Sequence, residues 1–425
     1  MKEESRTLTP KLRFPEFKIG PEWDAVNGDE LFDLIDRRPA PPGLPILAIT
    51  QEQGAVPRDQ IDYHVSVTEA SIASYKEVQP ADFIISLRSF QGGIEYSRFH
   101  GICSPAYLIL KRKGIGSDDF FRHLFKSERF IQQLTRNIEG LRDGKMISYK
   151  QLSEQLLPAP DPAEQQKIAA CLTSVDEQVA AEGRKLEALG AHKKGLMQQL
   201  FPREGETRPR LRLPEFRGAP AWRTLSIQEL IDRQFIVGHQ DGNHGELYPR
   251  AEEFSPTGIP YITANDFKSG HVEFENCKSL PAERALKFTK GVAKDGDILF
   301  AHNATVGPVA KLNTSYELVI LSTTATYFRC NQSQLSNDFL RCALEAPEFV
   351  EQYTRVMSQS TRDQVPIGAQ RKFVLQIPTL VEQQRVAACL SSLDEMITAQ
   401  SRKLDSLRAH KKGLIQKLFP SPEGV

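Results

Sequence analysis

A segment of 39 residues that occurs twice constrains this chain more than any other feature of its sequence. Glu164–Pro202 and Glu382–Pro420 align without a gap at a constant offset of 218, and 25 of their 39 positions are identical. Shared helical composition alone does not produce such agreement, so the chain contains an internal duplication. Any fold must therefore accommodate two copies of the same long element.

Each copy is predicted to form one long helix, because apolar residues recur with alternating steps of four and three. Such a helix would be roughly 58 Å long at 1.5 Å per residue, which exceeds what a small domain needs to bury one element. We therefore favour an antiparallel helical pair, in which each apolar seam buries the other, over two ordinary core helices. The predicted seam residues are Leu172, Val175, Val179, Leu186 and Leu189 in the first copy and Leu390, Leu393, Ile397, Leu404 and Leu407 in the second.

Polar residues interrupt the two seams at matching points. Glu182 and Lys193 interrupt the first seam, and Gln400 and Lys411 interrupt the second. Such positions usually fix the register of paired helices at some cost in stability.

The beginnings and ends of the two copies also match. Asp161 and Thr379 stand three residues before the glutamate that begins each copy, and this spacing predicts a capping box at each helix start. Gly195 and Gly413 lie close to the helix ends, where glycine costs about 1 kcal/mol relative to alanine. These glycines indicate either a break between two helical pieces or the close approach of a partner's backbone or helix.

The duplication extends beyond the helices. Pro10–Phe17 reads PKLRFPEF and Pro209–Phe216 reads PRLRLPEF at an offset of 199, and Trp23 matches Trp222 in the same way. A charged, turn-rich linker precedes the second of these motifs, so the second half begins near residue 203. The predicted order is a first globular domain at residues 1–160, a first spacer helix at 161–202, a second globular domain at 203–378 and a second spacer helix at 379–425.

The two globular halves share a scaffold of short strands but differ in the polar residues that follow them. Gly43–Thr50 corresponds to Gly258–Asn265, and Ala81–Ser86 corresponds to Gly296–Ala301, each predicting a buried strand. The expected fold class is α+β, with two pseudo-symmetric globular domains separated by a long antiparallel helical pair, a coiled coil. Such a chain keeps its frame constant while it presents two different surfaces.

Composition excludes several classes of protein. Lysine plus arginine equals aspartate plus glutamate, 54 against 54, so overall charge does not attract this chain to nucleic acid and any such binding must use local patches. The six cysteines are scattered singly without a C-x-x-C pair, which predicts reduced thiols and no metal. No segment approaches the roughly 20 apolar residues that span a bilayer, so we expect a cytoplasmic protein without membrane contact.

The sequence contains none of the short motifs that would indicate catalysis on DNA. It lacks the Asn/Asp-Pro-Pro-Tyr/Phe motif with which amino-methyltransferases hold an extruded base. It also lacks a G-x-G-x-x-G or Walker A loop to cradle a cofactor. We therefore expect no catalytic residues and no cofactor in this chain.

The motifs together resemble those of the specificity subunit of type I restriction-modification systems. The resemblance rests on the E-Q-Q-x-[IV]-A-A-C-L helix starts, the H-K-K-G-L-[MI]-Q-[QK]-L-F-P helix ends, the L-R-[FL]-P-E-F motifs and the [GA]-D-[FI] strand motifs. It covers essentially the whole chain. The helix motifs are specific, whereas the strand motifs alone are much weaker.

This resemblance implies a noncatalytic subunit with two target-recognition domains, each reading one half of a split double-stranded DNA sequence. The paired helices would separate these domains and dock two methyltransferase subunits, and restriction subunits can join that core. S-adenosylmethionine would then belong to the methyltransferase partner, and ATP and Mg²⁺ to the restriction partner.

Candidate DNA-reading residues follow from the chemistry of base recognition. Arginine reads guanine and asparagine or glutamine reads adenine through paired hydrogen bonds in the major groove, whereas basic and polar side chains also hold phosphates. Arginines that recur in both halves at an Arg-Asp pair suit phosphate contact or structural pairing better than base selection. The candidates in the divergent loops and polar runs are Arg88, Gln91, Arg142, Lys145, His239, Asn243, His302, Asn303 and Arg362.

Two alternative functions are compatible with parts of the sequence. A self-sufficient methyltransferase would need a cofactor loop, which is absent. A duplicated scaffold that binds only proteins is compatible with the zero net charge and would show no DNA sequence preference.

Overall fold

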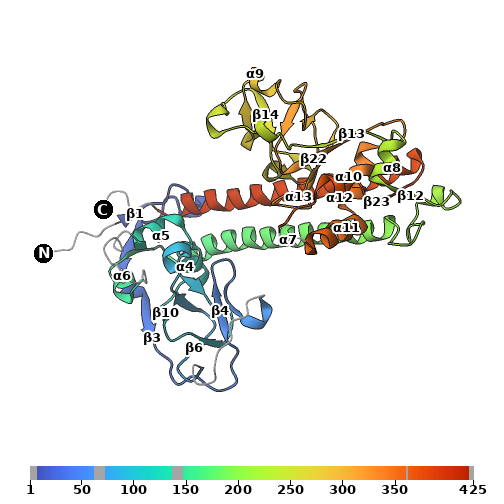
Figure 1. The fold of residues 1–425 in the computed structure, drawn as a ribbon. Helices are drawn as coiled ribbons and strands as arrows, with labels where there is room; N and C mark the ends of the chain where they lie inside the picture. Colours follow the sequence, from blue (N-terminus) through green and yellow to red (C-terminus); the bar gives the residue numbers. More distant parts are fainter. Residues whose placement is uncertain (1–6, 62–71, 136–146, 360–361, 421–425) are drawn as a thin grey trace. The chain divides into compact units, whose positions relative to one another are not determined.

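The computed structural model describes residues 7–61, 72–135, 147–359 and 362–420. The chain divides into two compact units, the first formed by residues 1–182 and 403–425 and the second by residues 183–402. Both boundaries fall inside the long helices, so each unit contains one globular part and a portion of each helix (Figure 1).

Both copies of the repeated segment form one unbroken helix, as their periodicity predicts. The helix α7 spans Pro162–Leu200 and α13 spans Leu380–Leu418, each 39 residues long. Gly195 and Gly413 lie within these unbroken helices, so of the two alternatives the break does not occur. A Cβ built at either glycine would meet no described atom within 4 Å, so there is open space beside each of them.

The long helices run antiparallel within each unit. In the first unit, Leu172 near the start of α7 belongs to the same buried core as Leu418 at the end of α13. In the second unit, Leu200 at the end of α7 shares a core with Leu390 near the start of α13. The Leu-Phe-Pro end of each helix is therefore buried beside the start of the other.

None of the ten predicted seam residues is fully exposed. Leu172, Leu390 and Leu404 are buried, and the other seven are half-buried. The polar positions of the seam make contacts between the helices, since Glu182 forms an ion pair with Lys403 in the first unit. Polar seam residues are thus paired rather than left without a partner.

In the first unit, antiparallel strands form two main sheets that frame an aromatic core. Trp23, Phe32, Phe83 and Phe120 are almost fully buried in this core. The first sheet has the order β1-β2-β11 and the second the order β3-β10-β7-β8, and two further pairs are β4-β5 and β6-β9. The strands are β1 Thr7–Leu8, β2 Trp23–Asn27, β3 Phe32–Ile35, β4 Leu47–Thr50, β5 Gly54–Pro57, β6 Lys76–Val78, β7 Asp82–Ile85, β8 Glu95–Tyr96, β9 Gly101–Cys103, β10 Leu108–Arg112 and β11 Leu156–Ala159.

Short helices connect these strands and pack against them. The longest of them in the described residues is α5. Its neighbour α4 is capped by Ser117, whose side chain accepts a hydrogen bond from the backbone N–H of Phe120. The helices and 3₁₀ turns of this part are α1 Gly28–Leu31, α3 Ser89–Gly92, α4 Asp118–Leu124, α5 Glu128–Thr135, α6 Tyr149–Ser153, η1 Pro15–Phe17 and η2 Arg58–Gln60.

The second unit repeats this frame with larger sheets. Its strand β19 is buried at every position, like its counterpart β7, which fits their continuous apolar runs. The sheets have the orders β13-β22-β19-β20-β16-β15, β17-β14-β21-β18 and β12-β23. The strands are β12 Arg223–Ser226, β13 Ile236–Asp241, β14 Ile259–Ile262, β15 Phe267–Lys268, β16 His271–Val272, β17 Lys278–Leu280, β18 Val292–Ala293, β19 Ile298–Ala301, β20 Val309–Lys311, β21 Val319–Leu321, β22 Ala325–Cys330 and β23 Val374–Ile377.

The helices of the second unit gather at the sheet ends and against the long helices. Trp222, Phe300 and Phe339 form the centre of the core that they enclose. The elements are α8 Ile227–Asp232, α9 Ala282–Ala285, α10 Asn337–Glu345, α11 Pro347–Ser358, α12 Ile367–Gln370, η4 Pro214–Phe216, η5 Gly245–Leu247, η6 Ala251–Glu253, η7 Ala264–Asp266 and η8 Phe274–Asn276.

The predicted α+β class with two sheet-rich parts is confirmed. No helix in the described part of the chain combines the length and apolar character needed to cross a membrane. None of the six cysteines, all of which are described, forms a disulfide. Cys171 and Cys389, which occupy matching positions in the two long helices, are both half-buried.

Candidate functional site

The repeated sequence motifs meet at the start of each long helix. In the first unit, Arg13 donates two hydrogen bonds of 2.7 Å to the carboxylate of Glu164, and Trp23 Nε1 donates a third of 3.0 Å. The side chain of Glu164 is only 1% exposed. Because a bidentate arginine and an indole N–H saturate this buried carboxylate, the contact fixes the globular part on the helix start.

The second unit repeats this contact with the corresponding residues, although the indole donates to the other carboxylate oxygen. Arg212 donates two hydrogen bonds of 2.7 Å to Glu382, and Trp222 Nε1 donates one of 3.1 Å. Only part of each predicted capping box therefore forms. Asp161 and Thr379 do accept hydrogen bonds from backbone N–H groups of the first helical turn, but the glutamates bind these tertiary partners instead. The leading motifs and both tryptophans are thus structural.

A second anchoring contact, here called the helix junction, joins three elements in each unit. In the second unit, Asp394 of α13 accepts hydrogen bonds from Arg341 of α10 at 2.7 Å and pairs with Lys193 of α7 at 2.5 Å. In the first unit, Asp176 of α7 pairs with Lys411 of α13 and lies 3.7 Å from Arg122 of α4. These charged residues occupy corresponding positions in the duplicated sequence, so they belong to the frame that both halves share.

Within each unit, two of the loops whose sequences differ between the halves lie side by side at the ends of strands. In the first unit, the turn between β4 and β5 contacts α3, which follows β7. A Cβ added to Gly92 of α3 would lie 2.6 Å from Cγ of Gln51, so the turn packs directly on this glycine. Gln53, Arg88 and Gln91 are exposed on these two segments. An arginine and two amides are thus presented by one pair of loops.

The second unit brings the corresponding loops together through the turn that precedes β22. The backbone N–H of Ala264 donates to Thr324 Oγ1 at 2.9 Å, and the backbone N–H of His302 donates to the carbonyl of Thr324 at 2.9 Å. Asn265 is exposed beside this contact, and Asn303 is half-buried. Ala304 has a φ of +64°, a strained conformation for a residue with a side chain. Corresponding loops therefore display different polar groups on one frame.

Comparison with known proteins identifies the family. Residues 240–409 match the family model described as the type I restriction modification DNA specificity domain. The chain is 22% identical to the type I restriction enzyme MjaVIII specificity subunit of Methanocaldococcus jannaschii, over 98% of this chain and 96% of that protein. These matches support the identification of this chain as a specificity subunit of a type I restriction-modification system.

Two solved structures share the fold of this specificity subunit. The type I restriction-modification system S subunit from M. genitalium matches with a TM-score of 0.57 and 16% identity, over 97% of this chain and 99% of that one. A chain from a study of complex assembly and conformational transition of the type I R-M system matches with a TM-score of 0.57 and 18% identity, over 95% and 99%. Subunits of this family are noncatalytic, which confirms the expected noncatalytic role.

The predicted DNA-reading residues of this specificity subunit fall into three groups: exposed or half-buried residues, residues outside the described ranges, and two buried histidines. Arg88, Gln91 and Asn243 are exposed on loops or turns, and Asn303 is half-buried with its Nδ2 3.5 Å from the carbonyl oxygen of Thr323. Arg362 is also exposed, directly after a gap in the described chain. Two predicted residues, Arg142 and Lys145, lie outside the described residues.

The two predicted histidines are buried, which corrects their expected place in solvated loops. His239 is 6% exposed on β13, where its Nε2–H donates to Gln370 Oε1 at 3.2 Å and its ring packs on Phe328. Burial lowers the pKa of His239 to about 4. His302 is 3% exposed at the end of β19, and burial lowers its pKa too. Neutral histidines enclosed in this way do not reach a DNA surface.

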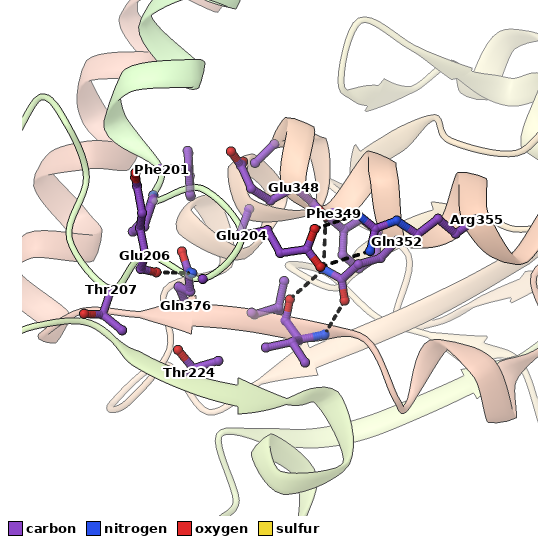
Figure 2. A pocket seen from close by; sticks show the side chains of 16 residues that line it. Phe201, Glu204, Glu206, Thr207, Thr224, Glu348, Phe349, Gln352, Arg355 and Gln376 are labelled. Atoms are coloured by element: carbon purple, nitrogen blue, oxygen red, sulfur yellow. Dashed lines mark hydrogen bonds and ion pairs between the residues drawn. The ribbon is translucent and has the colours of Figure 1, made fainter.

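A pocket of about 380 Å³ in the second unit lies away from these loops. Figure 2 shows its rim, where Arg355 pairs with Glu204 at 2.6 Å and Gln376 donates to the carbonyl of Glu206 at 2.7 Å. Its wall includes Gln352, whose amide bonds both the N–H and the carbonyl of Val374. None of the predicted reading residues lines it.

Sequence reasoning missed Gln51, Gln53 and Asn265. Each lies at or just beyond the end of a segment predicted as a strand, but the patterns in the sequence did not show which turns would lie beside the loops after β7 and β19. The signal that could have found them is the correspondence of Gly43–Thr50 with Gly258–Asn265, because both segments end in a turn with polar side chains.

Proposed function

We propose that each globular part reads one half of a bipartite target in double-stranded DNA. The recognition domains would be residues 1–160 and 203–378, with 161–202 and 379–425 as spacer segments. In this proposal α7 and α13 set the distance between the half-sites and dock two methyltransferase subunits. The family assignment already makes this chain a sequence-specific DNA-recognition subunit, and the proposal adds how its parts divide that work.

One observation carries the proposal: the same anchored frame displays different hydrogen-bonding side chains in its two halves. The contacts of Glu164 and Glu382 are alike, whereas the loops beyond the strands present Arg88 and Gln91 in one half and Asn303 in the other. Arginine and amide side chains discriminate bases through paired hydrogen bonds. A duplicated reader of two unlike sequences requires such a division between constant and variable parts.

The amended set of reading residues leaves out His239 and His302 because both are buried. We assign base contacts to the exposed or half-exposed amides and to one arginine, and phosphate contacts to the remaining basic residues. Phosphate contacts hold the duplex without sequence information. The base-reading set is Gln53, Arg88 and Gln91 in the first half and Asn243, Asn265 and Asn303 in the second, and the phosphate-binding set is Arg142, Lys145 and Arg362.

The partners follow from the division of work in such a complex. The chain itself would hold no cofactor, while S-adenosylmethionine would bind to the methyltransferase subunits and ATP with Mg²⁺ to restriction subunits. The complex would act in the cytoplasm. The duplicated protein-binding scaffold is not favoured by any contact or comparison.

Exchange of one recognition domain tests the proposal. Residues 217–377 are replaced by the equivalent region of a relative, which leaves both long helices and the first globular part unchanged. In cells that carry the chimera and its methyltransferase subunit, sequencing of methylated adenines should show one altered half-site and one unchanged half-site. A change in both half-sites would show that the two domains do not read independently, and binding of the purified complex without sequence preference would favour the scaffold.

A further inference from the structure

Lys126 occupies a central place beneath the two candidate loops of the first unit. It lies just after α4, and its Nζ is 2.9 Å from the carbonyl oxygen of Gly92 and 3.1 Å from that of Gln51. Its third contact is Oε1 of Glu95 on β8, at 2.5 Å. A lysine ammonium has three N–H donors, so these three acceptors use its full bonding capacity. One side chain therefore ties the β4–β5 turn, α3 and β8 together.

The carboxylate that pairs with Lys126 is shielded from water, and the lysine is partly shielded. Glu95 has only 2% of its side chain exposed and Lys126 has 28%, so the ion pair is screened much less than one on the surface. The backbone packs as tightly as the side chains. Gly93, with a φ of +80°, leaves no room for a Cβ, which would lie 2.0 Å from the carbonyl oxygen of Phe125. The end of α3 is thus pressed against the residue that precedes Lys126.

These contacts determine where the side chains of α3 lie. The helix α3 has a single turn between Arg88 and Gly93, so a shift at Gly92 moves Gln91 and Arg88 with it. Base discrimination by paired hydrogen bonds depends on the position and direction of the donors. A residue that holds both loops without facing the DNA can therefore affect which bases are accepted.

We propose that Lys126 is a positioning residue for the first half-site, which fixes the β4–β5 turn and α3 in the one arrangement that selects the correct bases. This inference rests on the proposed function of the two loops. It assigns to Lys126 a role in sequence selectivity that acts through the exposed side chains of Gln53, Arg88 and Gln91.

The second half of the chain provides a matched control at the corresponding position. Lys126 stands four residues after Arg122, and Glu345 stands four residues after Arg341. Glu345 has the opposite charge and faces the helix junction, where it pairs with Lys193 at 3.2 Å and with Arg341 at 3.1 Å. The second unit therefore does not build this lysine clamp, and substitution of Glu345 tests helix anchoring without the loops.

The test measures base discrimination by the full complex with its methyltransferase subunit. DNA duplexes carry every single-base substitution in either half-site, and binding is measured for wild type, Lys126→Met, Lys126→Arg, Glu95→Gln and Glu345→Gln. Lys126→Met should reduce discrimination at the first half-site by about tenfold at one or more positions, the scale of one bidentate contact, and leave the second half-site unchanged. Glu95→Gln and Lys126→Arg should keep most of it, since both retain a cation beneath the carbonyls.

Several outcomes would overturn the inference. Unchanged discrimination in an assembled Lys126→Met complex would do so, and so would an equal loss at both half-sites or a similar loss in Glu345→Gln. If Lys126→Met does not assemble, Lys126→Gln replaces it, because its amide can serve only two of the three acceptors and should lose discrimination in the same half-site. Arg88→Ala in the same assay separates the proposed function of the loop from the inference about Lys126. If Arg88→Ala leaves discrimination at the first half-site unchanged, the proposed role of the loop is wrong. If Arg88→Ala reduces discrimination but Lys126→Met does not, only the inference about Lys126 is wrong.

Discussion

The two units hold their globular parts on the long helices through the same contacts, yet they use one equivalent position in opposite ways. Lys126 contacts the variable loops of the first unit, whereas Glu345 contacts the helix junction of the second. In the second junction, Asp394 and Glu345 therefore both face Lys193 and Arg341. A duplicated frame can thus be kept while single positions next to it are assigned to either anchoring or recognition.

The interiors of the two units differ in their titrating groups as well. The second unit buries His239, His244 and His302, and burial lowers the pKa of each. The first unit buries His123, whose pKa falls to about 2, together with Glu95, whose pKa rises to about 7, in both cases mainly through burial. In the first unit these two shifts act in opposite directions as pH falls, whereas in the second unit the three histidine shifts act together.

The largest expected effect concerns the contact that both units share. Glu164→Ala and Glu382→Ala should each destabilise their own unit by about 3–5 kcal/mol, because removal of one partner leaves a largely buried arginine without a counterion. Trp23 and Trp222 are the two tryptophans of the chain and report separately on the units. Urea unfolding followed by fluorescence, with the other tryptophan replaced by phenylalanine, measures each loss. If only one of the two alanine variants lost stability, the two contacts would not be equivalent. Glu164→Gln keeps a hydrogen-bond acceptor and should lose less stability than Glu164→Ala.

The pH dependence of stability should distinguish the two interiors. The pKa of His239 is about 4 in the folded chain against an ordinary value of 6.5, so the unfolded chain binds a proton first and stability falls as pH drops below 6.5. Between pH 7 and pH 5 this single group should cost about 2 kcal/mol, and His239→Gln should remove that part of the loss.

Glu95 provides a control with the opposite sign in the first unit. Its pKa is raised from 4.5 to about 7, so the folded chain binds the proton first and gains stability as pH falls through this range. Glu95→Gln should therefore enlarge the acid-induced loss, while His239→Gln should reduce it. Thermal unfolding at pH 7 and pH 5 measures both variants, and equal slopes in the two would show that these groups do not determine the difference.

A smaller effect should distinguish the two helix junctions. Asp394→Asn should cost about 1–3 kcal/mol, because Arg341 and Lys193 are both largely buried beside it. Asp176→Asn should cost less than about 1 kcal/mol, since Arg122 keeps its hydrogen bonds of 2.7 Å to Asp119 and 3.1 Å to Thr173. Each variant is compared with wild type by urea unfolding. Equal losses would mean that the different surroundings of the two aspartates have no effect on stability.

The sequence by itself determined the elements whose pattern is local and repeated. The steps of four and three from Leu172 to Leu189 predict a long helix without knowledge of its partner, because an apolar stripe on one helix face depends only on spacing along the chain. The same holds for β7 and β19, whose continuous apolar runs predict buried strands. The matching halves also showed which motifs belong to the frame, and motif resemblance indicated the family.

The tertiary structure alone decided what each polar residue contacts. The spacing from Asp161 to Glu164 predicts a capping box, but Glu164 binds Arg13 and Trp23, which are about 140 to 150 positions away in the chain. His239 lies in a polar run that is typical of a solvated loop, yet that run pairs as strand β13 and encloses the ring. Lys126 carries no sequence signal at all, since its three acceptors come from segments that only folding brings together. Hydrogen-bond partners across such separations depend on packing, and a one-dimensional pattern does not contain that information.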